Sequence, residues 1–266
     1  MGHGFGGTQQ GSVADAAARF AEAGLCALTF DYRGFGESGG CPRQVVDIRG
    51  QLADWRAAIA FARSPSVGAG SIALWGSSLG GGHVLAIAAT DPSLSAVVAQ
   101  VPFVRPPRHV HGRTPGDAWR LLRVALRDWW AARTGQPRIF IKAVGEPGEL
   151  AAIASHDAVD AIGAMRNDTW HNEVAPGALI DMALWYRPGR RAARISMPLL
   201  LFLAGDDREA PAALARPVAL RAPKGELRSY PCTHFDFYRE PVRSMVIADQ
   251  VSFLRTHLIG TGRGIG

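Results

Sequence analysis

The sequence has few cysteines and no long hydrophobic run. Its three cysteines, Cys26, Cys41 and Cys232, show no Cys-x-x-Cys spacing. An odd number of cysteines cannot pair completely, which argues against a disulfide framework and a zinc site. No stretch approaches the roughly 20 apolar residues that a membrane-spanning helix needs, and the first residues lack the basic start and apolar run of a signal peptide. We therefore predict a cytoplasmic protein with no membrane partner.

The sequence also lacks the patterns of nucleic-acid and nucleotide binding. The net charge is +6, and residues 105–194 supply most of the excess, with 14 Lys and Arg against 9 Asp and Glu. There is no basic run, zinc finger or aromatic-basic interleaving, and no phosphate-binding or dinucleotide fingerprint. We predict a solvated, arginine-rich surface, no nucleic-acid partner, no metal and no cofactor. The alternative is attraction of an anionic substrate, such as an acyl thioester of a phosphorylated carrier.

Short apolar runs that alternate with amphipathic stretches are the main pattern present. In 266 residues, 47% are hydrophobic and 20% are charged, which fits an ordinary globular chain. The runs predict strands at 25–30, 71–75, 96–101, 199–203 and 226–230, and helices at 13–23, 45–62, 78–90, 210–221 and 241–258. This alternation predicts an α/β fold, with a mostly parallel sheet and helices on both faces.

One segment, residues 105–196, interrupts the alternation. It is helical in tendency, has Pro and Gly breaks, and carries five of the seven tryptophans, namely Trp119, Trp129, Trp130, Trp170 and Trp185. We interpret it as a cap inserted into a core formed by residues 1–104 and 197–266. The tryptophans are expected to form mainly the cap's own core. Any that face the active site would favour an apolar acyl or aryl group.

The pentapeptide Gly76-Ser77-Ser78-Leu79-Gly80 lies between an apolar strand and a helix. That context is what gives a G-x-S-x-G motif meaning as a nucleophile elbow. A serine hydroxyl is a poor nucleophile unless it is held in an exposed position beside a base, and a sharp strand-to-helix turn presents Ser78 in this way. A Cβ at Gly76 or Gly80 would crowd such a turn. Ser78 is therefore the candidate nucleophile, and Ser77 its supporting neighbour.

Further motifs follow one another along the chain, and together they identify a family. They are His3–Gly7, Asp31–Ser38, the elbow, Gly205–Pro211 and His234–Asp236. In this order the chain resembles a bacterial α/β-hydrolase with an inserted cap, of the broad serine-aminopeptidase, esterase and thioesterase grouping. The resemblance covers almost the whole chain.

The resemblance implies the two partners of the nucleophile. The family's acid lies after the strand that follows the cap, four residues before a proline, which selects Asp207 with Pro211; Asp206 remains the alternative. His234 follows the last predicted strand and precedes the closing helix, so it is the expected base. Ser, Asp and His then occur in the chain order of this fold. A thiol nucleophile at Cys232, two residues before His234, is the minor alternative.

The resemblance also assigns the oxyanion hole and a structural turn. The backbone N–H groups of Leu79 and Phe5 would bind the oxyanion. Asp31-Tyr32-Arg33-Gly34 is expected to be structural, and His3 is expected to be an ordinary surface or terminal histidine.

The start of the chain departs from the family. Two or three strands normally precede the His-Gly segment, which here begins at residue 3. The resemblance therefore implies that N-terminal strands are missing. An exposed sheet edge would invite pairing with another chain, including a second copy, and the oxyanion loop would be tethered only on its C-terminal side.

These observations predict a serine hydrolase that cleaves a carboxylic ester, thioester or amide of a small-molecule acyl substrate. The reaction would pass through an acyl-enzyme on Ser78. Alternatives with the same triad are an acyltransferase and a cofactor-free haloperoxidase. A non-catalytic ligand-binding relative is the alternative that the short N-terminus raises.

Overall fold

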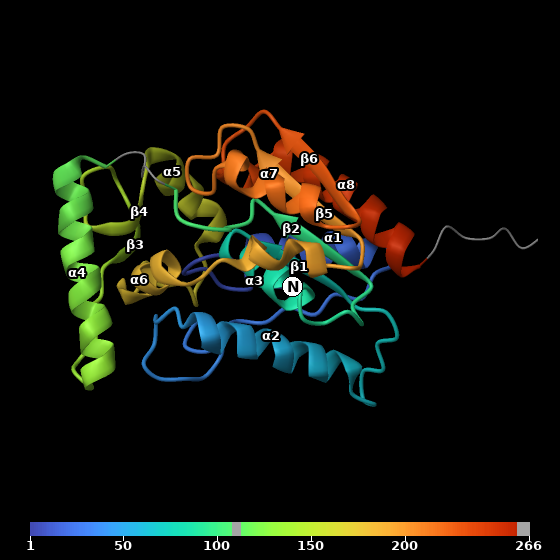
Figure 1. Cartoon of the computed structure of the whole chain (residues 1–266), viewed down its shortest axis with the longest axis horizontal. Coiled ribbons are helices and arrows are strands. Elements are labelled where there is room, and N and C mark those ends of the chain that lie inside the picture. The colour runs from blue at the N-terminus through green and yellow to red at the C-terminus, as the bar shows by residue number, and fades with distance from the viewer. Residues whose placement is uncertain (108–112, 260–266) are drawn as a thin grey trace, which may run out of the picture.

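A parallel β-sheet forms the centre of the molecule (Figure 1). The computed structural model describes residues 1–107 and 113–259. Within them, the sheet has the order β1-β2-β5-β6. Every neighbouring pair is parallel. The strands are β1 (Ala73–Ser77), β2 (Ala96–Gln100), β5 (Leu199–Ala204) and β6 (Gly225–Tyr230). The predicted α/β class with a mostly parallel sheet is confirmed.

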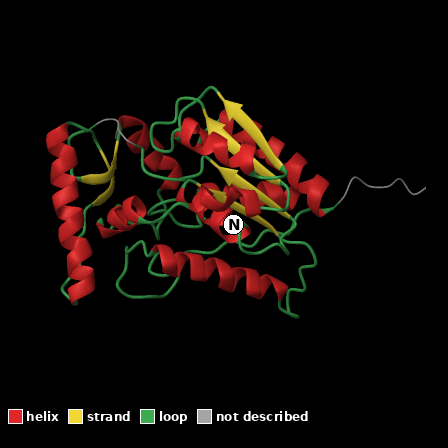
Figure 2. Cartoon of the chain, in the orientation of Figure 1, coloured by secondary structure: helices red, strands yellow, loops and turns green. Residues whose placement is uncertain are grey.

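Helices cover both faces of this sheet (Figure 2). Leu199, Leu201 and Leu203 of β5 belong to one buried cluster, and Leu200 and Phe202 belong to the other. Burial on both faces explains why β5 is a continuous apolar run and not an alternating one. The first face packs against α2 (Ile48–Arg63), α3 (Leu79–Ala88) and α7 (Ala212–Arg221), and the second against α1 (Ser12–Glu22) and α8 (Val242–Leu258).

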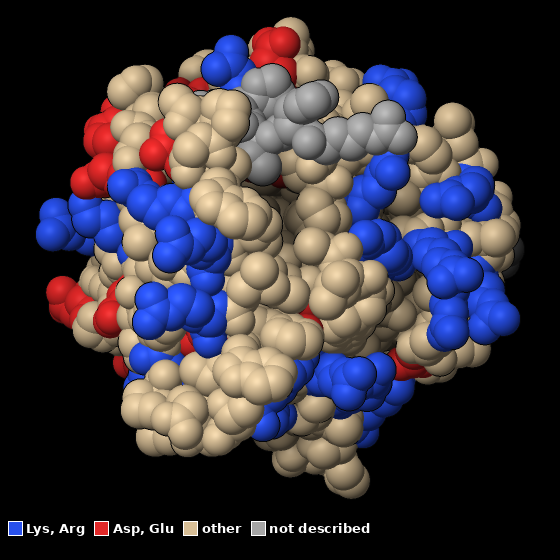
Figure 3. Space-filling view, turned by 60° about the vertical axis from the view of Figure 1, so that its left-hand side comes forward, with Lys and Arg blue, Asp and Glu red and all other residues tan. Residues whose placement is uncertain are grey.

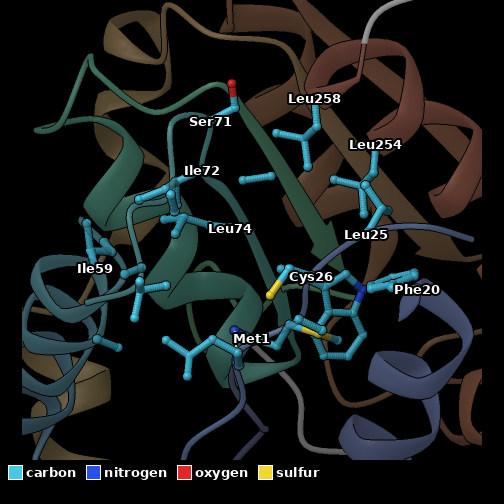
Figure 4. Close-up of a pocket in the computed structure, with 18 of the residues that line it drawn as sticks. Met1, Phe20, Leu25, Cys26, Ile59, Ser71, Ile72, Leu74, Leu254 and Leu258 are labelled. Carbon is cyan, nitrogen blue, oxygen red and sulfur yellow. Dashed lines mark hydrogen bonds between the residues drawn. The ribbon is translucent and has the colours of Figure 1, made fainter. Parts of the chain in front are cut away.

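The predicted strand at 25–30 is wrong: these residues form no ladder with any described strand. An apolar groove of about 370 Å³ lies between this segment and β1, and Leu25, Cys26, Ile72 and Leu74 are among its lining residues (Figure 4). A strand requires a hydrogen-bonded neighbour, and the groove separates the segment from β1.

The first residues of the chain are hydrogen-bonded to both sides of this groove. The Met1 amino group donates to Leu28 O at 2.7 Å, and Gly2 N donates to Trp75 O at 3.1 Å. Gly2 also forms an isolated parallel bridge with Gly76. The N-terminus is thus attached to the edge of the sheet at β1. Association of copies through that edge stays a prediction.

Most of the elements between β2 and β5 lie at one end of the molecule (Figure 1). They are α4 (Pro115–Thr134), which is outermost, β3 (Lys142–Gly145), β4 (Ala151–Ala154), α5 (His156–Met165) and α6 (Gly177–Leu184). The last element, the 3-10 helix η1 (Pro188–Arg194), instead packs against α3 and α7 beside the central sheet. The small parallel β3-β4 sheet was not expected from the helical tendency of this segment. Residues 108–112 of the segment lie outside the described residues.

Three of the five tryptophans of this segment do not belong to its core. Trp119, Trp130 and Trp185 are 61%, 64% and 41% exposed, so the sequence interpretation is wrong for these three. The helix α4 instead buries Ala125, Asp128 and Ala131 and packs against α6. Helical periodicity turns the other side, with its large aromatic residues, toward solvent.

Basic side chains are conspicuous on the face shown in Figure 3, where they gather on both sides of a band of uncharged residues. This agrees with the excess of positive charge in residues 105–194. Among the described helices, none is long and apolar enough to cross a membrane.

Candidate active site

Ser78 occupies a strained turn between β1 and α3. Its φ is +56° and its ψ is −116°, a conformation that non-glycine residues rarely adopt. Backbone hydrogen bonds hold the turn: Ser78 N donates to Gln100 O at 2.9 Å, and Phe103 N donates to Ser78 O at 2.9 Å. Such strain persists only where surrounding structure imposes it, and it is concentrated at functional sites.

Glycines around Ser78 allow the backbone segments to approach closely. A Cβ on Gly76 would lie 2.3 Å from Gly80 O, and one on Gly80 would lie 2.5 Å from His3 O. Both distances are far below van der Waals contact. A Cβ on Gly4 would lie 3.1 Å from the Ser78 Cβ, so the loop at residues 3–7 packs directly against the serine.

We expect Gly76→Ala to destabilise the protein, because the added methyl group must displace backbone and not a flexible side chain. Overpacking of this kind lowers the free energy of unfolding by about 1–3 kcal/mol. Urea denaturation measures the change. Gly70→Ala is the matched control, since a Cβ there meets no atom within 4 Å. Equal stability of the two variants would contradict the prediction.

Asp207 and His234 come together at the carboxyl ends of β5 and β6. His234 Nδ1 lies 2.7 Å from Asp207 Oδ2, and both side chains are buried. The other oxygen, Asp207 Oδ1, accepts hydrogen bonds from Glu209 N at 2.9 Å and Ala210 N at 2.6 Å. Asp206 is exposed. Of the two candidate acids, Asp207 is therefore the one that contacts the imidazole.

Opposing effects act on the pKa of His234. Burial lowers it, because a charged imidazolium loses hydration. The charge of Asp207 and its hydrogen bond raise it, as does the charge of Glu209, and the net result is a pKa above the ordinary value of 6.5. This environment stabilises an imidazolium, which is the species a general base becomes when it accepts a proton.

Ser78 and His234 line one cavity of about 70 Å³. Among the hydrogen bonds of the described residues, none joins Ser78 Oγ to His234. Catalytic hydrogen bonds are often long without substrate and tighten only in the complex. The cavity wall also includes Phe5, Val144 and Phe235, which give it apolar character.

Two backbone N–H groups are placed to bind an oxyanion. Leu79 is the first residue of α3, so its N–H has no acceptor within the helix. In the part of the chain that the structure describes, Phe5 N has no hydrogen-bond acceptor. The predicted one-sided tether of this loop is wrong: Gly2 N bonds Trp75 O before it, and the Trp170 indole donates to Gly6 O at 2.9 Å.

Glu209 and Tyr238 are polar residues of this cavity to which sequence reasoning assigned no role. Glu209 Oε1 accepts from Ser155 Oγ at 3.1 Å, and burial raises the pKa of this carboxyl. Tyr238 packs edge-on to His234, with ring centroids 6.2 Å apart. Their short separations from Asp207 and His234 in the sequence are the only indication that could have found them.

The other candidate side chains, Cys232, His3 and Asp31, have surroundings that indicate structural roles. Cys232 is buried, and burial raises the pKa of its thiol to about 11, so the thiolate needed for attack is not formed near neutral pH. His3 is buried and not at the surface as expected, and burial lowers its pKa to about 4. Asp31 accepts from Gln9 N and Glu37 N, as expected of a turn residue.

Among residues 1–107 and 113–259, no group of three or more His, Cys, Asp or Glu side chains is arranged to hold a metal ion.

Comparison with known proteins places these features in context. The model of the family described as "Serine aminopeptidase, S33" matches residues 1–241. The quorum-quenching protein AidA of Acinetobacter baumannii is 36% identical over 258 residues, which are 96% of this chain and 84% of that protein. The thiohydrolase apmlB of Arthrinium phaeospermum is 34% identical over 133 residues, covering 50% of this chain and 42% of that protein.

A solved structure shares the fold. The alpha/beta hydrolase GrgF from Penicillium sp. sh18 superposes with a TM-score of 0.77 at 24% identity, covering 97% of this chain and 89% of that chain. The similarity therefore extends over the central sheet and the segment between β2 and β5.

Proposed function

The chain belongs to the serine aminopeptidase S33 family of α/β hydrolases, and we propose that it hydrolyses its substrate through an acyl-enzyme on Ser78. It is a hydrolase that acts on ester or thioester bonds. The 2.7 Å contact between His234 Nδ1 and Asp207, beside the strained Ser78, is the observation that carries the proposal.

In the proposed mechanism, His234 Nε2 takes the Ser78 proton while Ser78 Oγ attacks the carbonyl carbon. Asp207 accepts the Nδ1–H hydrogen bond, which fixes the tautomer that leaves Nε2 free as a base. The N–H groups of Leu79 and Phe5 bind the oxyanion. The imidazolium then protonates the leaving group. Water, deprotonated by His234, releases the acyl group and regenerates the enzyme.

The substrate we propose is a small molecule with an apolar acyl group. Phe5, Val13, Val144, Ile153 and Phe235 line the cavity over Ser78 and support this. We further propose that residues 105–196 act as a cap, because Val144 and Ile153, from β3 and β4, contribute to the cavity wall. The similarity to AidA, a quorum-quenching protein, is compatible with a small-molecule ester as substrate.

We also propose that the protein works in the cytoplasm. Cys26, Cys41 and Cys232 all carry free thiols, and free thiols persist in a reducing compartment.

Hydrolysis of p-nitrophenyl butanoate and of a butanoyl thioester tests the function. We expect turnover of both, with kcat/KM falling as the pH falls through a pKa above 6.5. The sign follows because only neutral His234 accepts the serine proton, and Asp207 keeps the imidazolium form to a higher pH than in a free histidine. A pH profile of kcat/KM measures this pKa. A folded protein with no turnover of either substrate would contradict the proposed function.

A further inference from the structure

A continuous line of buried hydrogen bonds runs from α8 through the sheet to the catalytic cavity. The Trp75 indole N–H donates to Gln250 Oε1 at 2.9 Å, and Gln250 Nε2 donates to Gln100 Oε1 at 2.8 Å. Gln100 Nε2 donates to Ser77 Oγ at 3.0 Å, and Ser77 Oγ lies 2.7 Å from the Tyr238 hydroxyl. All five side chains are buried.

The Trp75 indole, at the end of the line away from the cavity, fixes which group donates and which accepts in each hydrogen bond. Because an indole N–H can only donate, Gln250 must turn its carbonyl oxygen toward Trp75. Its NH₂ group then faces Gln100, whose carbonyl oxygen accepts. The NH₂ group of Gln100 is left to donate to Ser77. Each amide orientation therefore follows from the one before it.

Ser77 has one hydroxyl hydrogen to place, and two arrangements are available. If Tyr238 donated to Ser77, the Ser77 hydrogen would have no acceptor among the described residues, although this side chain is only 2% exposed. Leaving a buried donor unsatisfied costs about 1–3 kcal/mol. If Ser77 donates to Tyr238 instead, the free hydrogen belongs to Tyr238. Both residues line the cavity beside Ser78, but Tyr238 is the more exposed of the two, at 8% against 2%.

We propose that the Tyr238 hydroxyl donates a hydrogen bond into the catalytic cavity, to an acceptor oxygen within the acyl group of the substrate. The enzyme then prefers acyl chains that carry an ether, carbonyl or hydroxyl oxygen over hydrocarbon chains of the same length. Burial raises the pKa of Tyr238, so the donor keeps its proton throughout the working pH range. This inference rests on the proposed function and specifies its substrate class.

Matched pairs of esters test the preference. p-Nitrophenyl methoxyacetate and butanoate differ by one oxygen in place of a methylene, as do 3-methoxypropanoate and pentanoate. We expect Tyr238→Phe to lower kcat/KM for the oxygen-containing member of at least one pair by roughly 3–10-fold more than for its hydrocarbon partner, the range for one hydrogen bond. Equal changes within every pair would overturn the proposal.

Two further variants keep the test decisive. Tyr230→Phe is the matched control. The Tyr230 hydroxyl donates to Asp249 outside the cavity, so we expect the ratio of kcat/KM for the oxygen-containing ester to kcat/KM for its hydrocarbon partner to stay as in the wild type. Ser77→Ala removes the donor that orients Tyr238, and we expect a smaller loss in the same ratio. If Tyr238→Phe does not fold, the ratio in Ser77→Ala decides, and an unchanged ratio there overturns the proposal.

Failure of the inference can be separated from failure of the proposed function. A fluorophosphonate probe reports on the reactive serine without any acyl group. Labelled wild-type enzyme whose ester preference does not depend on Tyr238 overturns the inference alone. Wild-type protein that is folded but neither labels nor hydrolyses esters overturns both.

Discussion

Replacing Ser78 by alanine is expected to abolish covalent labelling by a fluorophosphonate probe and to reduce ester hydrolysis on the order of 10⁶-fold, as in other serine hydrolases that lose their nucleophile. Ser78 supplies the oxygen that attacks the substrate carbonyl in the first step of the proposed mechanism, and without it no acyl-enzyme forms for water to hydrolyse. Intact-protein mass spectrometry measures the label, and steady-state assays measure the hydrolysis.

Ser77 gives this experiment its control. It adjoins Ser78 in the sequence, but its hydroxyl is 2.7 Å from Tyr238 and buried, within the hydrogen-bonded line behind the elbow. We expect Ser77→Ala to label to full stoichiometry. Full labelling of Ser78→Ala would assign the nucleophile to another residue.

Asp207→Asn is expected to lower kcat on the order of 10⁴-fold. Asparagine keeps an oxygen for Glu209 N and Ala210 N, so the loop after β5 is retained. Its amide NH₂ group, however, donates where the carboxylate accepted. The imidazole must then accept at Nδ1 and carry its proton on Nε2, which is the wrong tautomer for taking the serine proton.

Asp206→Asn is the matched control for Asp207→Asn. Asp206 is exposed, so we expect its kcat to remain within about twofold of the wild type, since surface changes of this kind have small effects. In Asp207→Asn the charge that raises the pKa of His234 is gone. We therefore expect the fall of its residual kcat/KM with decreasing pH to begin at a lower pH than in the wild type. A larger loss in Asp206→Asn than in Asp207→Asn would assign the acid to Asp206.

The sequence anticipated the elements that carry the chemistry because these have strong local patterns. The apolar run that ends at Gly76 and the glycines at 76 and 80 indicate a strand, a tight turn and a helix, and β1 and α3 lie there. The uninterrupted run at 199–203 likewise indicated a strand buried on both faces, which is β5. In each case the local pattern and the final packing favour the same structure.

The mistaken predictions arose where local pattern and packing differ. Residues 25–30 have strand-like composition, but no described strand lies beside them to complete a ladder. Trp119 and Trp130 are large and apolar, yet the inner side of α4 is formed by the smaller Ala125, Asp128 and Ala131, with Asp128 paired to Arg138. Composition does not reveal which side of a helix meets a neighbour.

The sequence by itself determined the fold class, the elbow at Ser78 and the order in which serine, acid and histidine follow one another. These depend on short segments, whose conformations are set by local sterics and hydrophobic periodicity. The spacing to Pro211 favoured Asp207 over Asp206, but only the tertiary structure placed Asp207 against His234 and brought Glu209 and Tyr238 to the cavity. It also linked Trp75 to Ser77 through residues up to 175 positions apart. Such contacts depend on how strands and helices pack across the sheet, and no local pattern encodes that packing.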